Sequence, residues 1–170
     1  MKTNINWLYF PKTEKAPKEL IKVVSTFEKH SKAILKQKNI DASAVLGLLA
    51  ADLKKQGFHL SSSNGKVAVP VLYGLNGMVE KQFLIDAYES KAGIVLEVEA
   101  AAAVINKLYL KDIFEASLMD GANYLIIAVR NTNPTSNGQK DFETVCRFLE
   151  AIYSSKRLNL PLQGVLIIGY

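Results

Sequence analysis

The chain has 170 residues, of which 49% are hydrophobic and 22% are charged, and its 21 Lys and Arg residues exceed its 16 Asp and Glu residues to give a net charge of +5. These values suit a globular protein with one hydrophobic core and exclude a largely disordered chain, and no run reaches the roughly 20 apolar residues that a membrane span needs. We therefore expect one domain over residues 1–170, no contact with a membrane and a cytoplasmic location, while the basic excess permits a polyanionic partner without requiring one.

Two amphipathic helices are predicted near the N-terminus, over residues 15–56. Residues 15–38 carry apolar side chains at the i, i+3, i+4 and i+7 spacing, and residues 44–56 repeat the pattern until Gly57. Five lysines form a stripe on the first helix, nearly opposite its apolar face: Lys18, Lys22, Lys29, Lys32 and Lys36. This lysine stripe could follow a phosphate backbone, or it could simply keep a solvated helix face soluble.

A series of antiparallel strands is predicted after these helices. β-Branched alternation, interrupted by turn residues, places three strands at residues 66–72, 81–89 and 93–99. A turn cluster at residues 61–65 precedes the first strand, and a glycine-containing loop at residues 73–77 follows it.

The last two of these strands form a predicted hairpin that carries acidic residues. A turn that pairs Glu89 with Ile94 places Asp86 directly opposite Glu97, and Glu99 shares that face because side chains alternate along a strand. Opposed carboxylates, whose β-carbons lie about 4.5–5.5 Å apart in such pairs, repel each other. A raised pKa, a basic side chain or a divalent cation can offset the repulsion, unless the hairpin faces solvent and its acids serve solubility.

Helices and buried strands alternate in the C-terminal half. The small side chains of residues 100–103 suit a tight passage from strand to helix, and Gly121 ends the helix that follows. The predicted segments are a helix at 105–119, a strand at 124–129, a helix at 141–155 and a strand at 165–168. Both strands are continuously apolar, which is typical of central strands covered on two faces. The expected fold class is α/β, in a mixed α+β form, with a mixed β-sheet flanked by helices.

This order of elements and the acids of the hairpin together resemble the restriction-endonuclease-like, or PD-(D/E)xK, superfamily of nucleases. The family motif is an acid on one hairpin strand, followed on the next strand by an acid, any residue and a lysine. Ile85-Asp86 matches the first part and Glu97-Val98-Glu99 the second, so this chain has E-x-E in place of E-x-K. As architecture the resemblance covers residues 44–168, and it implies a nuclease-like core over residues 57–170.

The resemblance implies a metal-dependent DNA endonuclease that hydrolyses phosphodiester bonds. Asp86, Glu97 and the main-chain carbonyl of Val98 would hold Mg²⁺ or Mn²⁺, and the ion would polarise the scissile phosphate and lower the pKa of a bound water. Glu99 would orient or deprotonate the attacking water.

Two lysines of the next helix are candidates for the positive charge that the family takes from its motif lysine. Lys107 and Lys111 are four residues apart and share a helix face, although plain surface lysines would show the same pattern. DNA is the expected partner, and its candidate contacts are the lysine stripe, the loop 73–77 and the polar loop 131–138. The family also implies that a homodimer could cut both strands of a duplex.

Two other functions fit the same residues. The missing motif lysine favours a catalytically inactive nucleic-acid-binding or assembly domain with the same fold. The acids could instead bind a basic surface of a partner in a structural interaction module. Other enzyme classes gain no support, because the sequence has no G-x-G-x-x-G after a strand, no Walker loop and no G-x-S-x-G motif.

Overall fold

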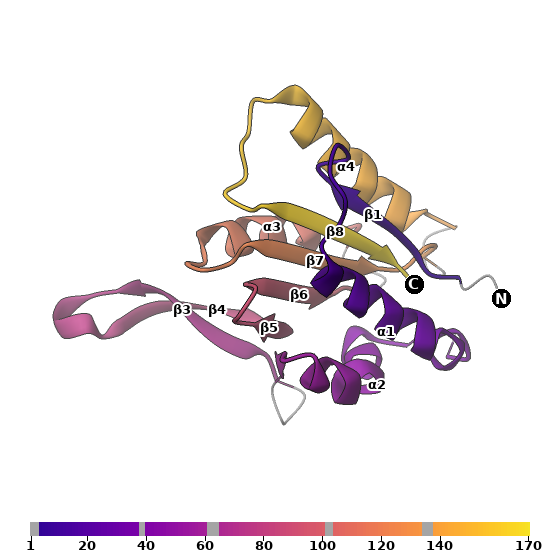
Figure 1. Cartoon of the computed structure of the whole chain (residues 1–170), viewed down its shortest axis with the longest axis horizontal. Helices are drawn as coiled ribbons and strands as arrows, with labels where there is room; N and C mark the ends of the chain where they lie inside the picture. Colours follow the sequence, from indigo (N-terminus) through magenta and orange to yellow (C-terminus); the bar gives the residue numbers. More distant parts are fainter. Residues whose placement is uncertain (1–3, 38–39, 61–64, 101–103, 134–137) are drawn as a thin grey trace.

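The computed structural model describes residues 4–37, 40–60, 65–100, 104–133 and 138–170. In this part of the chain a mixed sheet of six strands forms the centre of the molecule (Figure 1). Across the sheet the strands are β1 (Asn6–Phe10), β8 (Gly164–Gly169), β7 (Tyr124–Val129), β6 (Ile94–Val98), β5 (Ala87–Glu89) and β2 (His59–Leu60). The central strands β6, β7 and β8 are parallel, and the pairs β1–β8, β5–β6 and β2–β5 are antiparallel.

Two pairs of helices cover the two faces of this sheet. The pair α1 (Lys18–Leu35) and α2 (Ala42–Lys55) lies on one side, and α3 (Leu108–Leu118) and α4 (Asp141–Ser155) lie on the other (Figure 1). Alternate residues of the central strands point to opposite sides, so Leu96 packs with α1 and α2 whereas Val95 packs with α3 and α4. The sheet therefore separates two hydrophobic cores, which explains why its central strands are apolar throughout.

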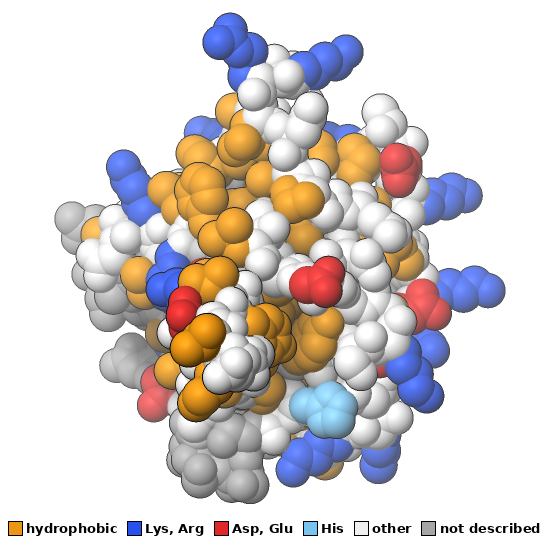
Figure 2. Space-filling view, turned by 90° about the vertical axis from the view of Figure 1, so that its left-hand side faces the viewer, with side chains coloured by type: hydrophobic (Ala, Val, Ile, Leu, Met, Phe, Trp, Pro, Cys, Tyr) orange, Lys and Arg blue, Asp and Glu red, His pale blue; other side chains and the backbone are white. Residues whose placement is uncertain are grey.

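A separate two-stranded ribbon projects from the body. It consists of β3 (Val67–Tyr73) and β4 (Val79–Ile85), joined by a short 3-10 turn at Leu75–Gly77 (Figure 1). Hydrophobic side chains gather at its free end, where Leu75 is 82% exposed and Met78 is 71% exposed (Figure 2). At the opposite end of the ribbon, Val67 pairs with Ile85. Lys66, which precedes β3, and Asp86, which follows β4, therefore lie next to each other at the base of the ribbon.

The predicted fold class is confirmed, and several boundaries agree with the sequence pattern. The strand at Tyr124–Val129 and the helix at Asp141–Ser155 have the predicted ends, and Glu89 pairs with Ile94 as expected. Parts of three predicted connections lie outside the described residues: the turn cluster 61–65, the passage 100–103 and the loop 131–138.

Three predictions about the elements were wrong or incomplete. Residues 81–89 do not form one strand, because the chain bends at Asp86, and β4 pairs with β3 whereas β5 pairs with β6. The helix expected from residue 105 begins at Leu108, since Lys107 adopts a left-handed conformation with φ 56° that no helix can continue through. Strands β1 and β2 were not predicted.

None of the helices in the described segments is long and apolar enough to cross a membrane.

Candidate metal centre

The carboxylates of Asp86 and Glu97 meet around the ammonium group of Lys66. Lys66 Nζ lies 3.0 Å from Asp86 Oδ1 and 2.9 Å from Glu97 Oε2. The second oxygen of Asp86 accepts a hydrogen bond of 2.8 Å from the main-chain N–H of Val98. Lys66 therefore provides the basic side chain that offsets the repulsion between the two acids.

The local structure explains how these three residues come together. Asp86 stands at the bend between β4 and β5, and Glu97 is the penultimate residue of β6, so the β5–β6 pairing brings both acids to the same end of the hairpin. Lys66 reaches them because the first rung of the ribbon, Val67 with Ile85, lies beside Asp86. Asp86 is 8% exposed and Glu97 only 1% exposed, so the acids lie inside the protein.

A second group of acids lies on the other side of Glu97. One carboxylate oxygen each from Glu97, Glu99 and Asp112 lies within 4.8 Å of the others. Glu99 is held through its backbone, because its N–H donates to the carbonyl of Ala128 at 2.8 Å and its carbonyl accepts from the hydroxyl of Tyr170 at 2.7 Å. We call these three residues the carboxylate triad.

Asp112 enters the triad from helix α3. It lies on the buried stripe of that helix, together with Tyr109, Ile113 and Ala116, and is only 3% exposed. A carboxylate on the apolar face of a helix is uncommon, because its desolvation is costly unless a partner compensates for it.

The pKa values of the triad are raised. Burial raises the pKa of Asp112 to about 9, and the charges of Glu99 and Glu97 raise it further in the same direction. Burial and the charge of Asp86 raise the pKa of Glu97 to about 8, against the opposing effect of Lys66. Burial also raises the pKa of Glu99, although a hydrogen bond with Asp112 opposes this shift. Without a bound metal ion, Asp112 and Glu97 are therefore largely protonated at neutral pH.

Lys66 keeps its charge in this environment. Burial would lower its pKa, but the neighbouring charges of Glu97 and Asp86 outweigh burial and raise it. The ammonium group is thus protonated whenever the acids are ionised.

Two buried carboxylate oxygens of the triad fit a hard cation. Glu97 Oε1 and Asp112 Oδ2 have no hydrogen-bond partner among the described residues. A buried polar atom is nearly always paired with protein, water or an ion, and carboxylate oxygens are the ligands that Mg²⁺ and Mn²⁺ prefer. The residues present are therefore suited to a divalent cation.

A cavity of about 730 Å³ adjoins the acids. Helix α2 contributes small residues to one wall, including the exposed Gly47, while Asp86, Glu99 and Asp112 contribute to another. Basic side chains also line the cavity: Lys54 of α2, Lys66 just before β3 and Lys111 of α3. The cavity thus offers an anionic ligand positive charge at its edge and access to the carboxylates.

Lys107 and Lys111, the two lysines predicted from the sequence, do not contact the acids in the way that Lys66 does. Lys111 lines the cavity, but its ammonium group pairs with Glu115 at 2.9 Å. Lys107 is exposed at the start of α3 and does not line the cavity. Among the described residues, neither lysine forms an ion pair with Asp86 or Glu97.

Sequence reasoning missed Lys66 and Asp112 as site residues. Lys66 could have been found by pairing the strands at 66–72 and 81–89 as a hairpin, since their register brings it next to Asp86. Asp112 carries a simpler signal, because it is the acidic residue in the apolar phase of its helix.

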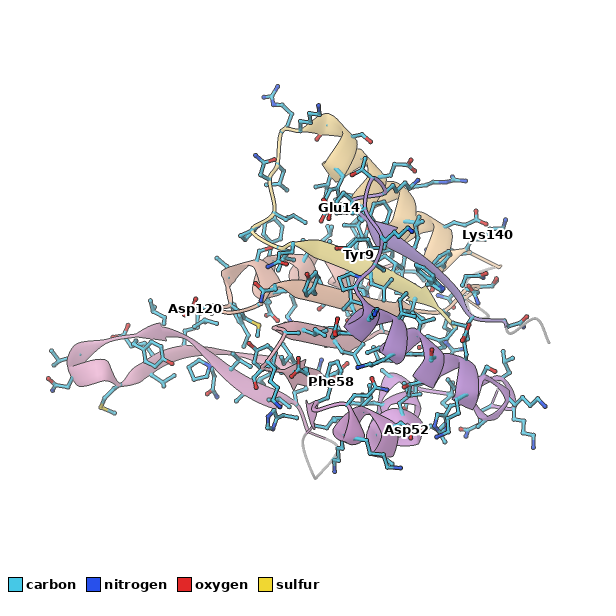
Figure 3. The ribbon with its side chains drawn as sticks, in the orientation of Figure 1. Tyr9, Glu14, Asp52, Phe58, Asp120 and Lys140 are labelled. Carbon is cyan, nitrogen blue, oxygen red and sulfur yellow. The ribbon has the colours of Figure 1, made fainter. Side chains whose placement is uncertain are left out.

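The lysine stripe of α1 is exposed along its whole length. Its member Lys29 pairs with Asp52 of α2 at 2.6 Å, and Asp52 also lies 2.8 Å from His30 Nε2 (Figure 3). These contacts join the two helices and lower the pKa of Asp52 to about 2, chiefly through the hydrogen bond with Lys29.

The fold is of the restriction-endonuclease-like type. The crystal structure of the restriction endonuclease BglII in complex with a DNA 16-mer matches this chain with a TM-score of 0.58 and 15% sequence identity, over 99% of this chain and 76% of the other. No protein-family model and no curated protein sequence matches the chain. At this identity the likeness establishes the fold alone.

Proposed function

We propose that this protein is a metal-dependent DNA endonuclease that hydrolyses phosphodiester bonds, with E-x-E in place of the family's E-x-K. The observation that carries the proposal is the cluster of buried carboxylates and one lysine, Asp86, Glu97, Glu99, Asp112 and Lys66, beside a cavity at the carboxyl end of β6. The fold supports it, because the structural neighbour is an endonuclease bound to DNA.

The acids would divide the chemistry between them. Asp86, Glu97 and the carbonyl of Val98 would hold Mg²⁺ or Mn²⁺, which supplies a Lewis acid for the scissile phosphate and lowers the pKa of a bound water. The bond from the Val98 N–H to Asp86 fixes the orientation of that carboxylate. Glu99, which Tyr170 and β7 hold in place, would orient or deprotonate the attacking water.

Lys66 is our candidate for the positive charge that the family takes from the motif lysine. It contacts both acids directly and lines the cavity, so a phosphate entering the cavity would meet its ammonium group. Lys111 lines the same cavity and would contribute to phosphate binding there, whereas Lys107, at the start of α3, would contact a phosphate outside the cavity.

DNA binding would use the exposed basic and projecting parts of the surface. Lys54 and the lysine stripe of α1 present positive charge, and such charge dominates the affinity for a phosphate backbone. The loop 73–77 forms the free end of the ribbon, and a two-stranded ribbon has the width that the major groove admits. The exposed apolar side chains of α3, Phe114 and Leu118, would suit the contact of a homodimer.

One observation favours a second candidate, a nucleic-acid-binding domain without catalysis. Lys66 already contacts both Asp86 and Glu97, so the two acids are stabilised without a metal ion. Such a domain would bind DNA in the presence of EDTA with the same affinity as in Mg²⁺.

The test combines metal binding with DNA nicking. Mg²⁺ or Mn²⁺ is titrated calorimetrically into the wild-type protein and Asp86→Asn, and both are assayed on supercoiled plasmid. Asp120→Asn is the matched control, because Asp120 is an exposed acid next to the opposite end of the sheet, where β7 begins (Figure 3). We expect binding and nicking to fail together in Asp86→Asn alone. A wild-type protein that binds DNA but neither binds metal nor nicks would establish the second candidate instead.

A further inference from the structure

Much of the lining of the cavity beside the acids is apolar. Leu46, Gly47 and Ala50 contribute to it from α2, Leu60 from β2 and Leu108 from the start of α3. Leu108 is 41% exposed even though it is a large hydrophobic residue. A metal ion and a phosphate group bind to charged and polar groups, so the three leucines have no part in the proposed hydrolysis itself. They suit a different part of the substrate.

The size of the cavity indicates which part. Its volume of about 730 Å³ lies within the range of about 300–1,000 Å³ that is typical of pockets for small molecules, so it can hold a nucleotide with its base. It cannot hold both strands of a duplex, whose major groove alone is about 12 Å wide and 8.5 Å deep. Intact duplexes bind to open surfaces instead, where about 1,000–2,500 Å² of protein is buried.

The charged groups of the lining fit the backbone of the same nucleotide. Lys54, Lys66 and Lys111 line the cavity together with the leucines, and ammonium groups bind phosphates. Pockets that receive an unstacked base hold it between aromatic or apolar side chains. None of the described residues that line this cavity is aromatic, so the leucines would make that contact.

The depth of the acids decides how the strand enters. Glu97 is 1% exposed and Asp86 is 8% exposed, so a scissile phosphate has to enter the cavity to meet them. The bases of a paired strand stay inside the duplex, and a phosphate that entered alone would leave the three leucines in contact with water. The bases of an unpaired strand can leave the stack and cover the leucines.

We propose that the cavity binds an unstacked nucleotide of an unpaired DNA strand, so that the protein acts on single strands, gaps and flaps in preference to intact duplex. The leucines contact the base, and the three lysines bind the phosphates on either side of it. At a gap or flap, the lysine stripe of α1 and the β3–β4 ribbon are free to contact the adjoining duplex. Cleavage of the bound strand rests on the proposed function, whereas its binding does not.

The first test measures binding without cleavage. Fluorescence anisotropy of the full chain in EDTA compares labelled oligo(dT) with its duplex with oligo(dA), and we expect the single strand to bind more tightly. Leu108→Ala removes one apolar wall, and Gly47→Phe fills the cavity from a position where an added β-carbon meets no atom within 4 Å. Each should weaken oligo(dT) binding by about 10-fold and leave duplex binding unchanged.

Leu158→Ala is the matched control for Leu108→Ala. Leu158 is 45% exposed, close to the 41% of Leu108, but it does not line the cavity. The control should bind oligo(dT) as the wild type does.

The second test measures cleavage. The wild-type chain in Mn²⁺ is given single-stranded circles and relaxed, closed duplex circles of the same sequence. Supercoiled plasmid does not distinguish the two substrates, because negative supercoiling favours strand separation. We expect the single-stranded circles to be cut faster by about 10-fold or more.

The two tests separate this proposal from the proposed function. Equal cutting of both circles would overturn the preference for unpaired DNA and keep the endonuclease. Wild-type affinity for oligo(dT) in both Leu108→Ala and Gly47→Phe would overturn the binding of a nucleotide in the cavity. Tight oligo(dT) binding that both variants weaken, without cleavage of either circle, would keep the proposal and remove the endonuclease. A wild-type chain that binds neither strand nor duplex would overturn both.

Discussion

Lys66 donates a hydrogen bond of 2.9 Å to Glu97, a residue 31 positions further along the chain. The carboxylate that receives it is 1% exposed, and Asp86 lies 3.0 Å from the same ammonium group. A positive charge therefore occupies the centre of the acidic hairpin. This arrangement gives Lys66 two separable roles, one in stability and one in the proposed chemistry.

Lys66→Met tests both roles. Without the ammonium group, the folded protein must either keep an ionised Glu97 buried next to Asp86 or protonate it, so we expect the free energy of unfolding to fall by about 1–3 kcal/mol at pH 8, less than for a fully buried pair because Lys66 is partly exposed. The loss should be smaller at pH 5, where Glu97 is protonated. Nicking should fall by about 100-fold or more. Urea denaturation at the two pH values and plasmid nicking measure these effects.

Lys54→Met is the control for the Lys66 variant. Lys54 also lines the cavity, but it is exposed on α2. Equal losses of nicking in the two variants would mean that only the general positive charge of the cavity matters.

Asp112→Asn should change how stability depends on pH in the metal-free protein. The pKa of Asp112 is raised from 3.8 to about 9, so the folded state keeps a proton that the unfolded state releases. The wild-type free energy of unfolding therefore falls as pH rises between these values, by up to about 1.4 kcal/mol per pH unit from this group. Asparagine cannot ionise, so the variant should lose stability less steeply. Urea denaturation in EDTA from pH 5 to pH 8 measures the slope.

The free energy of unfolding of Asp112→Asn will still fall as pH rises, because the pKa of Glu97 is also raised. Glu115→Gln should keep the wild-type slope. Parallel stability curves for the wild type and Asp112→Asn would contradict the assignment of a protonated, buried Asp112.

Substitutions at Gly47 test whether the substrate binds in the cavity. A β-carbon added at Gly47 meets no atom within 4 Å, and the residue lies on α2 where that helix lines the cavity. Gly47→Ala should stabilise the helix by about 0.5–1 kcal/mol and leave nicking unchanged. Gly47→Phe should fold but fill part of the cavity and lower nicking by about 10-fold or more, with metal binding retained. Full activity in Gly47→Phe would show that the substrate approaches the acids by another route.

A substitution at Gly93 tests whether the turn between β5 and β6, which sets the register between Asp86 and Glu97, requires glycine. Its φ is +71°, and an added β-carbon would lie 2.1 Å from the carbonyl oxygen of Gly121. Gly93→Ala should therefore cost more than the roughly 1–2 kcal/mol of a left-handed alanine alone. Gly138→Ala isolates the conformational cost, because Gly138 has φ +77° and no atom within 4 Å. Thermal unfolding of both variants compares the two costs, and equal values would exclude a steric clash at Gly93.

The sequence predicts those parts of the fold that rest on local patterns. β7 is continuously apolar and α4 has a clear helical period, so both were placed at their observed ends. β1 was missed because it is a short edge strand that gains its hydrogen bonds from β8, at the other end of the chain. The bend at Asp86 was missed because alternation continues through it, and only pairing with two different partners divides β4 from β5.

The candidate site also combines residues that a local pattern predicts with residues that only the pairing of distant segments brings together. The sequence predicts Asp86, Glu97 and Glu99 as site residues because one hairpin register brings them together, and Glu97 and Glu99 lie two residues apart on the same face of one predicted strand. Lys66 depends on the register of a second hairpin, which contains irregularities after Pro70 and Leu72 that counting from the loop would miss. The helical period of α3 marks Asp112 as buried, but its position next to Glu97 and Glu99 depends on how α3 packs on the sheet, which no local spacing encodes.

The pairing of β3 with β4 fixes Lys66 and Asp86 at one end of the ribbon, so the positions of these two residues do not depend on the length of the ribbon. The rung between Val67 and Ile85 sets the positions of Lys66 and Asp86, whereas Tyr73 and Val79 form the last rung at the far end. Residues added or removed beyond that last rung leave the first rung unchanged, but a single residue inserted after Lys66 would displace its ammonium group from both acids. The ribbon end is therefore a natural insertion point for a foreign peptide or a second binding module, in a chain whose acidic centre stays intact.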